Sequence, residues 1–119
     1  MQISTTMMRV TERWREPCEN AFEFILQVDP EQLANLINSK VLRPGDLSFA
    51  AEILGQAQSS RLVRSTLLPL LEHPESVVRE GAIYGLIPHL DSETVLRLSH
   101  VGRSDVSAGV RAAAKDAIK

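Results

Sequence analysis

The sequence predicts an all-α protein, an α-solenoid of about three stacked helical hairpins with an N-terminal capping helix. Aromatic residues make up only 4% of the chain while Leu and Ala dominate its apolar residues, which favours closely packed helices over a β-sandwich. Apolar residues recur every three or four positions between turn signals. A stretch of the chain also repeats at a constant interval of 32 residues.

The N-terminal part combines a flexible start with the capping helix. Residues 1–10 have weak periodicity, so we expect a flexible N-terminus followed by a single domain over residues 11–119. The capping helix is expected after Arg15 and up to Val28, because Pro17 fits the first turn of a helix but not its interior.

Turn and capping residues divide the rest of the domain into helices. Asp29-Pro30-Glu31 is a strong start signal, and we expect Asp46 to cap the helix that follows the break at Arg43-Pro44-Gly45. Four more helices are expected. The first runs from Ser59 or Ser60 to Leu71 and bends at Pro69, and the second follows a turn at residues 73–76. The third runs from Asp91 to a turn at residues 102–105, and the last from Val106 or Ser107 to Ile118.

The repeat places equivalent small and apolar residues in register. Ala50, Ala82 and Ala114 are separated by 32 residues each, as are Leu54, Leu86 and Ile118. One helical hairpin cannot bury both of its apolar stripes, but stacked neighbours bury them in a continuous core. We therefore expect units over about 29–57, 59–90 and 91–119, with Gly81 and Gly85 where helices approach closely.

Residues 73–86 (HPESVVREGAIYGL) and 110–114 (VRAAA) resemble the HEAT-repeat family, in the short form also called PBS-lyase HEAT-like repeats. The resemblance implies an α-solenoid that presents a surface to partners. It also implies that Arg79 and Arg111 tie the loops of adjacent repeats together, with anion binding as the alternative role. The first unit departs from the pattern, because Asp46-Leu47 stands where the other units have Val-Arg. A compact bundle of five or six helices has the same amphipathic pattern and stays open as an alternative.

The exposed side of the second helices carries the candidate binding site. Val78, Ala82 and Leu86 define the buried stripe, so Glu80 and Tyr84 lie on the opposite side. The 32-residue shift adds Glu52 and Asp116 to the same row. In HEAT-like stacks these helices line the concave face, and an acidic row with one Tyr suits a partner segment bearing Lys or Arg. The alternative is an ordinary solvated face with one scattered Tyr.

Composition argues against several other functions. A net charge of −2 disfavours nucleic-acid binding, and no apolar stretch reaches the length of a membrane helix. A single cysteine, Cys18, allows no internal disulfide and suggests the cytoplasm. His73, His89 and His100 lack the spacing of a metal site and lie near helix ends, where they can contact terminal carbonyls. We expect no catalytic residues, no metal and no cofactor.

The sequence therefore predicts a non-catalytic protein-binding module, working as an adaptor, scaffold or inhibitor. Two alternatives stay open: an accessory subunit or chaperone of an enzyme system, similar to those of phycobilin lyases, and a nucleic-acid-binding protein of HEAT-like type. Small and apolar residues run to the C-terminal end of the last unit, from Ala112 to Ile118. This edge predicts contact with a second copy, a homodimer, or with a partner.

Overall fold

The computed structural model of the protein describes residues 16–119, with side chains from residue 20 onward. The expected flexible N-terminus, the start of the domain at residue 11 and the side chain of Cys18 lie outside these residues. Across residues 16–119 the chain forms α-helices and two short 3-10 helices and has no strand. The all-α prediction is therefore confirmed.

The helices follow one another with short connections. In chain order they are α3 (Glu16–Val28), α4 (Pro30–Asn38), α5 (Pro44–Leu54), α6 (Ser60–Leu67), η1 (Leu68–Glu72), α7 (Ser76–Leu86), η2 (Ile87–His89), α8 (Ser92–Ser104) and α9 (Ala108–Ala117).

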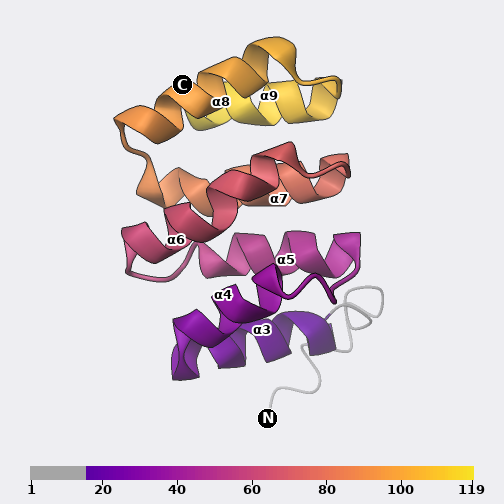
Figure 1. The fold of residues 1–119 in the computed structure, drawn as a ribbon, viewed down its shortest axis with the longest axis vertical. Coiled ribbons are helices and arrows are strands. Elements are labelled where there is room, and N and C mark those ends of the chain that lie inside the picture. The colour runs from indigo at the N-terminus through magenta and orange to yellow at the C-terminus, as the bar shows by residue number, and fades with distance from the viewer. Residues whose placement is uncertain (1–15) are drawn as a thin grey trace, which may run out of the picture.

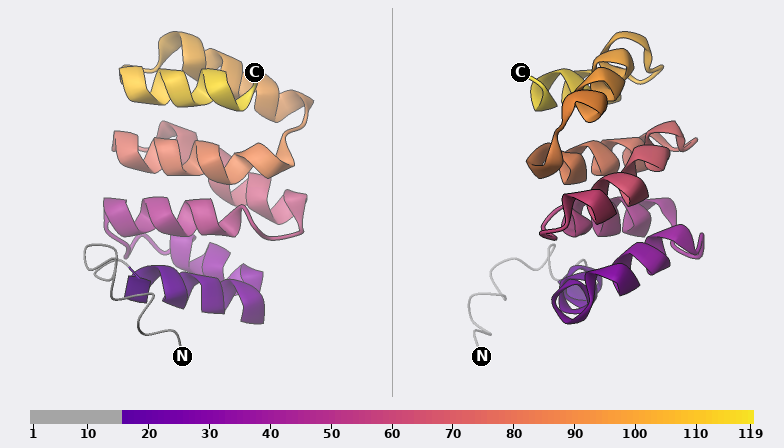
Figure 2. Two further views of the ribbon diagram at one scale, coloured as in Figure 1. Left: turned by 180° about the vertical axis from the view of Figure 1, so that it is seen from behind. Right: turned by 60° about the vertical axis from the view of Figure 1, so that its left-hand side comes forward.

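The helices form two layers that run along the 44 Å long axis of the molecule. One layer carries α4, α6 and α8, which face the viewer in Figure 1. The other carries α3, α5, α7 and α9, which lie side by side in chain order when the molecule is seen from behind (Figure 2). Within this second layer α3 packs on α5, α5 on α7 and α7 on α9. The face built by these four helices is the one that holds the candidate site.

Side-chain caps fix most of the helix starts. Asp29 accepts a hydrogen bond from the backbone N–H of Glu31, with Pro30 at the first helical position as predicted. Ser59, Asp91 and Ser107 cap α6, α8 and α9 in the same way. These caps satisfy backbone N–H groups that a helix cannot pair internally.

Two details of the predicted elements are wrong. Asp46 does not cap α5, because that helix already begins at Pro44, and Asp46 lies in its first turn instead. The turn expected at residues 102–105 starts later, since α8 continues to Ser104 and buries Gly102 within the helix. The bend expected at Pro69 takes the form of the 3-10 helix η1.

The 32-residue interval of the sequence reappears in the helix positions. The helices α5, α7 and α9 begin at Pro44, Ser76 and Ala108. The equivalent residues Ala50, Ala82 and Ala114 are each fully buried. We call the contact of α4–α5 with α6–α7 the first junction, and the contact of α6–α7 with α8–α9 the second junction.

Glycines hold the first junction at backbone contact. A Cβ atom added to Gly81 would lie 2.6 Å from the carbonyl oxygen and 2.8 Å from the Cα of Ser48, and one added to Gly85 would collide with the carbonyl oxygen of Ala51. The same approach brings Gly55 against the backbone of Gly85. Only glycine fits at Gly81 and Gly85, which confirms the close approach expected there.

Candidate functional site

The predicted row of polar side chains lies across three helices of one layer. Tyr84 lies on α7 with 43% of its surface exposed, and Glu80 precedes it by one helical turn. Glu52 is exposed on α5, and Asp116 is exposed on α9. Because α5, α7 and α9 lie side by side, one acidic residue flanks Tyr84 from each neighbouring helix.

The phenol of Tyr84 reports how near these acids are. Partial burial is the largest influence that raises the pKa of Tyr84, followed by the negative charges of Glu80, Glu52 and Asp116. Ionisation would place a phenolate beside three carboxylates, which is why each of them favours the neutral phenol. Interactions between exposed charges fade beyond roughly 10 Å at 0.1 M salt, so acids that act on one hydroxyl belong to one local surface.

Two apolar side chains extend the row along α7 and its continuation. Val77 and Ile87 are each 43% exposed, and they flank Glu80 and Tyr84, with Val77 three residues before Glu80 and Ile87 three residues after Tyr84. We call these four residues, together with Glu52 and Asp116, the acidic row. An ion pair of 3.6 Å joins Asp116 to Lys119, but both side chains are more than 70% exposed, so the pair is weak and leaves Asp116 accessible.

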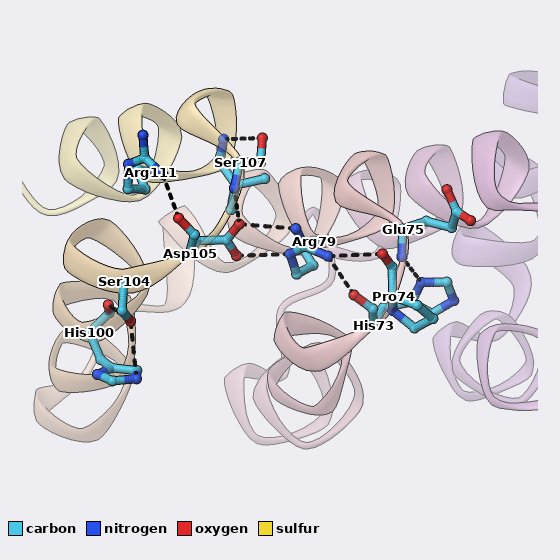
Figure 3. Close-up of polar contacts among 10 residues, drawn as sticks. His73, Pro74, Glu75, Arg79, His100, Ser104, Asp105, Ser107 and Arg111 are labelled. Atoms are coloured by element: carbon cyan, nitrogen blue, oxygen red, sulfur yellow. Dashed lines mark hydrogen bonds and ion pairs between the residues drawn. The ribbon is translucent and has the colours of Figure 1, made fainter.

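Arg79 is buried in the second junction, whereas the equivalent Arg111 is partly buried on α9 (Figure 3). Arg79 is 8% exposed, and its guanidinium donates to both carboxylate oxygens of Asp105 at 2.8 and 2.9 Å. Its remaining nitrogen donates to the carbonyls of His73 and Pro74 at 2.7 and 3.2 Å. Arg79 thus joins the loop before α7 to the loop before α9.

Arg111 repeats part of this arrangement one unit further on. It donates to the carbonyl of Asp105 at 2.6 Å, just as Arg79 donates to the carbonyl of His73, and Asp105 follows His73 by 32 residues. Burial alone would raise the pKa of Asp105, but hydrogen bonds from Arg79 and from the N–H of Ser107, with the charges of Arg79 and Arg111, outweigh burial and lower it. These bonds leave neither Arg79 nor Asp105 open to a ligand.

Sequence reasoning missed the role of Asp105. It did place His89 near a helix end, where its ring can contact terminal carbonyls, but did not name the partners. The sequence pattern assigned Asp105 only to a turn. The available signal was its place 32 residues after His73, in the loop that precedes α9. His89 is 7% exposed, with Nε2 2.7 Å from the carbonyl oxygen of Gly55 and Nδ1 2.7 Å from Oγ of Ser60. Because a carbonyl only accepts, Nε2 carries the proton, and His89 closes the end of α5 from the neighbouring unit.

The C-terminal edge is less apolar than the sequence suggested. Ala113 and Ala114 are already buried within the chain, Ala117 and Ile118 are half-buried, and Ala112 is exposed. The homodimer through this edge stays a prediction, for which light scattering over a range of concentrations is the direct measurement.

Within residues 16–119 no three His, Cys, Asp or Glu side chains gather into a group that could hold a metal ion. In the same range no helix combines the length and apolar character that crossing a membrane requires. Comparisons of the chain with protein-family models, with curated proteins and with solved structures find no match.

Proposed function

We propose that the chain is a HEAT-like α-solenoid that binds a basic segment of a protein partner along the acidic row and carries out no catalysis. The repeat architecture is supported by a common interval of 32 residues. This interval separates the starts of α5, α7 and α9, the buried alanines, and the carbonyl contacts of Arg79 and Arg111. One observation supports the binding site above all others: acidic residues on three adjacent helices, α5, α7 and α9, lie around a single exposed tyrosine. Partial burial, followed by their charges, raises the pKa of that tyrosine.

The chemistry of the acidic row suits Lys and Arg side chains. Carboxylates accept charge-assisted hydrogen bonds from these cations, and the face of a Tyr ring attracts them further. Val77 and Ile87 supply apolar surface at the ends of the stripe on α7, where the aliphatic stems of Lys and Arg can pack. A tyrosine with partly buried edges is also a residue type that often dominates binding energy at interfaces.

The spacing of the helices sets the spacing of the partner's cations. Neighbouring packed helices lie about 8–10 Å apart. A segment in the polyproline II conformation advances about 3.1 Å per residue with three residues per turn, so side chains three positions apart share one face and match that distance. We therefore expect the bound segment to adopt this conformation, with Lys or Arg at about every third residue.

The interaction depends on several contacts acting together. A single exposed ion pair contributes only about 0.2–1 kcal/mol, and salt screens it. Binding is therefore expected to weaken steeply with rising salt and to require more than one acid of the row.

The test uses labelled peptides and fluorescence anisotropy at neutral pH. Three peptides of equal length and with equal numbers of charged residues are compared. The first has Arg at every third position, the second has the same residues in scrambled order, and the third has Glu in place of every Arg. The first should bind most tightly, and Tyr84→Ala combined with Glu52→Gln should weaken it by about tenfold or more, as for loss of a hot-spot residue.

A control variant replaces one exposed apolar side chain and one exposed acid on the other layer. Leu96 is 70% exposed on α8 and Glu93 is exposed on the same helix, so Leu96→Ala combined with Glu93→Gln should leave binding unchanged. Equal affinity for the Arg and Glu peptides, or equal loss in both double variants, would exclude the acidic row as the binding surface.

A further inference from the structure

A second possible site lies in the first junction and shares no residue with the acidic row. A cavity of about 490 Å³ opens between the loop that joins α4 to α5 and the loop that joins η1 to α7. Its lining includes Leu42 from the first loop, Leu47 from α5 and His73 from the second loop. Its volume lies within the range of roughly 300–1,000 Å³ that small-molecule sites occupy.

The internal repeat explains why this space is open. Shifted by 32 residues, Leu47 corresponds to Arg79, His73 to Asp105 and Leu42 to Pro74. In the second junction the guanidinium of Arg79 bridges Asp105 and the carbonyls of the preceding loop (Figure 3). Leu47 has no polar atoms and is shorter than arginine. The matching groove of the second junction, lined by Asp105 and Arg97, holds only about 300 Å³.

Two of the polar residues around the larger cavity, His73 and Lys40, can donate hydrogen bonds. Asn38 and Thr66 can both donate and accept. The backbone N–H of Glu75 donates to Nδ1 of His73 at 3.0 Å, so the proton of the neutral ring is on Nε2, which is left as a donor. Lys40 brings the only full charge among the lining residues, and none of those residues is acidic. Thr66 also lines the cavity with only 4% of its surface exposed, and no hydrogen bond joins its hydroxyl to another described residue.

The backbone at Lys40 adds a second sign of function. Lys40 follows α4 with φ of 67°, a left-handed conformation in which glycine is the favoured residue after a helix. Among the described residues it is the only non-glycine residue with positive φ. A lysine kept where glycine would be less strained suggests that its charge is used.

We propose that the first junction binds a small organic acid, a carboxylate with an aliphatic or aryl-alkyl body. The carboxylate lies toward Lys40 and Nε2 of His73, and the body lies against Leu42, Leu47 and Leu70. Charge complementarity decides between ligand classes, because a cavity with one cation and no acid favours an anion over an amine or a neutral alcohol.

The experiment is a titration of the isotope-labelled full chain, followed by NMR, with three ligands that share one body: hexanoate, hexanol and hexylamine. Hexanoate should shift the amide signals of residues 39–43 and 72–75. It should also bind about tenfold more tightly than hexanol, as one charge-assisted hydrogen bond predicts. Hexylamine should bind more weakly than either. Equal affinities for all three, or shifts spread over the whole surface, would overturn the proposal.

Two variants separate the roles of charge and space. Lys40→Gly should raise the midpoint of urea unfolding by relieving the left-handed lysine, yet should remove the preference for hexanoate over hexanol. Leu47→Arg combined with His73→Asp should fill the cavity with the pair found in the second junction and abolish binding of all three ligands. A Lys40→Gly protein that keeps the preference, or a folded double variant that still binds, would contradict the proposal.

Discussion

The two junctions of this molecule join equivalent helices with different chemistry. In the first junction, Gly81 and Gly85 let α7 touch the backbone of α5, and the buried ring of His89 bonds to Gly55 across the contact. In the second junction, a buried ion pair between Arg79 and Asp105 joins the loops that precede α7 and α9. The first junction therefore depends on steric fit and the second on electrostatics.

The difference lies in the side chains at equivalent positions of the two junctions. Replacing arginine by Leu47 and aspartate by His73 leaves the first junction with a cavity, while its glycines keep the helices in contact. The second junction fills the equivalent place with its own side chains. Variants that exchange or remove these features should affect one junction and spare the other.

The largest expected effect is the loss of the ion pair in the second junction. Arg79→Leu leaves Asp105, whose side chain is 8% exposed, without its partner, and breaks the bonds to His73 and Pro74. Removing one member of a buried pair costs about 3–5 kcal/mol, so the free energy of unfolding measured in urea should fall by about 3 kcal/mol.

Arg97→Leu is the matched control in the same junction. Its pair with Glu72 spans 3.8 Å, and the two side chains are 37% and 83% exposed. The expected loss is below about 1 kcal/mol. Similar losses for the two variants would show that the Arg79 pair has no special role in the second junction.

Steric fit in the first junction is tested by adding one methyl group. Gly81→Ala would press against the backbone of Ser48, which cannot move aside like a flexible side chain. The gain in helix propensity is about 1 kcal/mol, whereas overpacking costs about 1–3 kcal/mol, and more against rigid backbone. We therefore expect the free energy of unfolding to fall by about 2 kcal/mol.

Two glycine controls sharpen this comparison. A Cβ atom at Gly45 meets nothing within 4 Å, so Gly45→Ala should be neutral or stabilising. Within the α8–α9 pair, Gly102→Ala would meet the flexible chain of Lys115 at 3.1 Å and should cost less than Gly81→Ala. Thermal unfolding of the three variants measures all three effects, and equal melting temperatures would contradict a backbone contact in the first junction.

Acid should weaken the second junction selectively. The pKa of Asp105 is lowered in the folded chain, so its contribution to stability is complete above the unfolded pKa of about 3.9 and is lost as pH falls through the lower folded value. Unfolding free energies between about pH 6 and pH 3 should fall less in Asp105→Asn than in the wild type. Parallel pH profiles for the two proteins would contradict this assignment.

The smallest expected effect is a shift in the titration of Tyr84. It is the only tyrosine in the chain, so phenolate absorbance reports on it alone. Its midpoint should lie above the usual value of about 10, and Glu80→Gln should lower it, since the charge of Glu80 is the strongest of the three acidic influences. Glu93→Gln on α8 is the control and should leave the midpoint unchanged.

The sequence was most informative where the 32-residue interval places several residues at equivalent positions. The buried alanines and the grouping of Glu52, Glu80, Tyr84 and Asp116 follow from periodicity and the 32-residue shift. The role of Arg79 between loops was expected from the resemblance to HEAT repeats. Features that depend on contact between units were not predictable in the same way. Asp105 and His89 have hydrogen-bond partners 26 and 34 residues away in the sequence. The cavity is open because Leu47 has no guanidinium group to fill the space that Arg79 fills in the second junction.

Native-state hydrogen exchange of the wild type and Arg79→Leu tests the two-junction account most directly. In a stack of units that contact only their neighbours, weakening one junction should release the part beyond it. In Arg79→Leu, amides of α8 and α9 should lose protection at low urea while those of α5 and α7 keep theirs. A uniform loss of protection across all four helices, or a larger loss in α5 than in α9, would contradict the account.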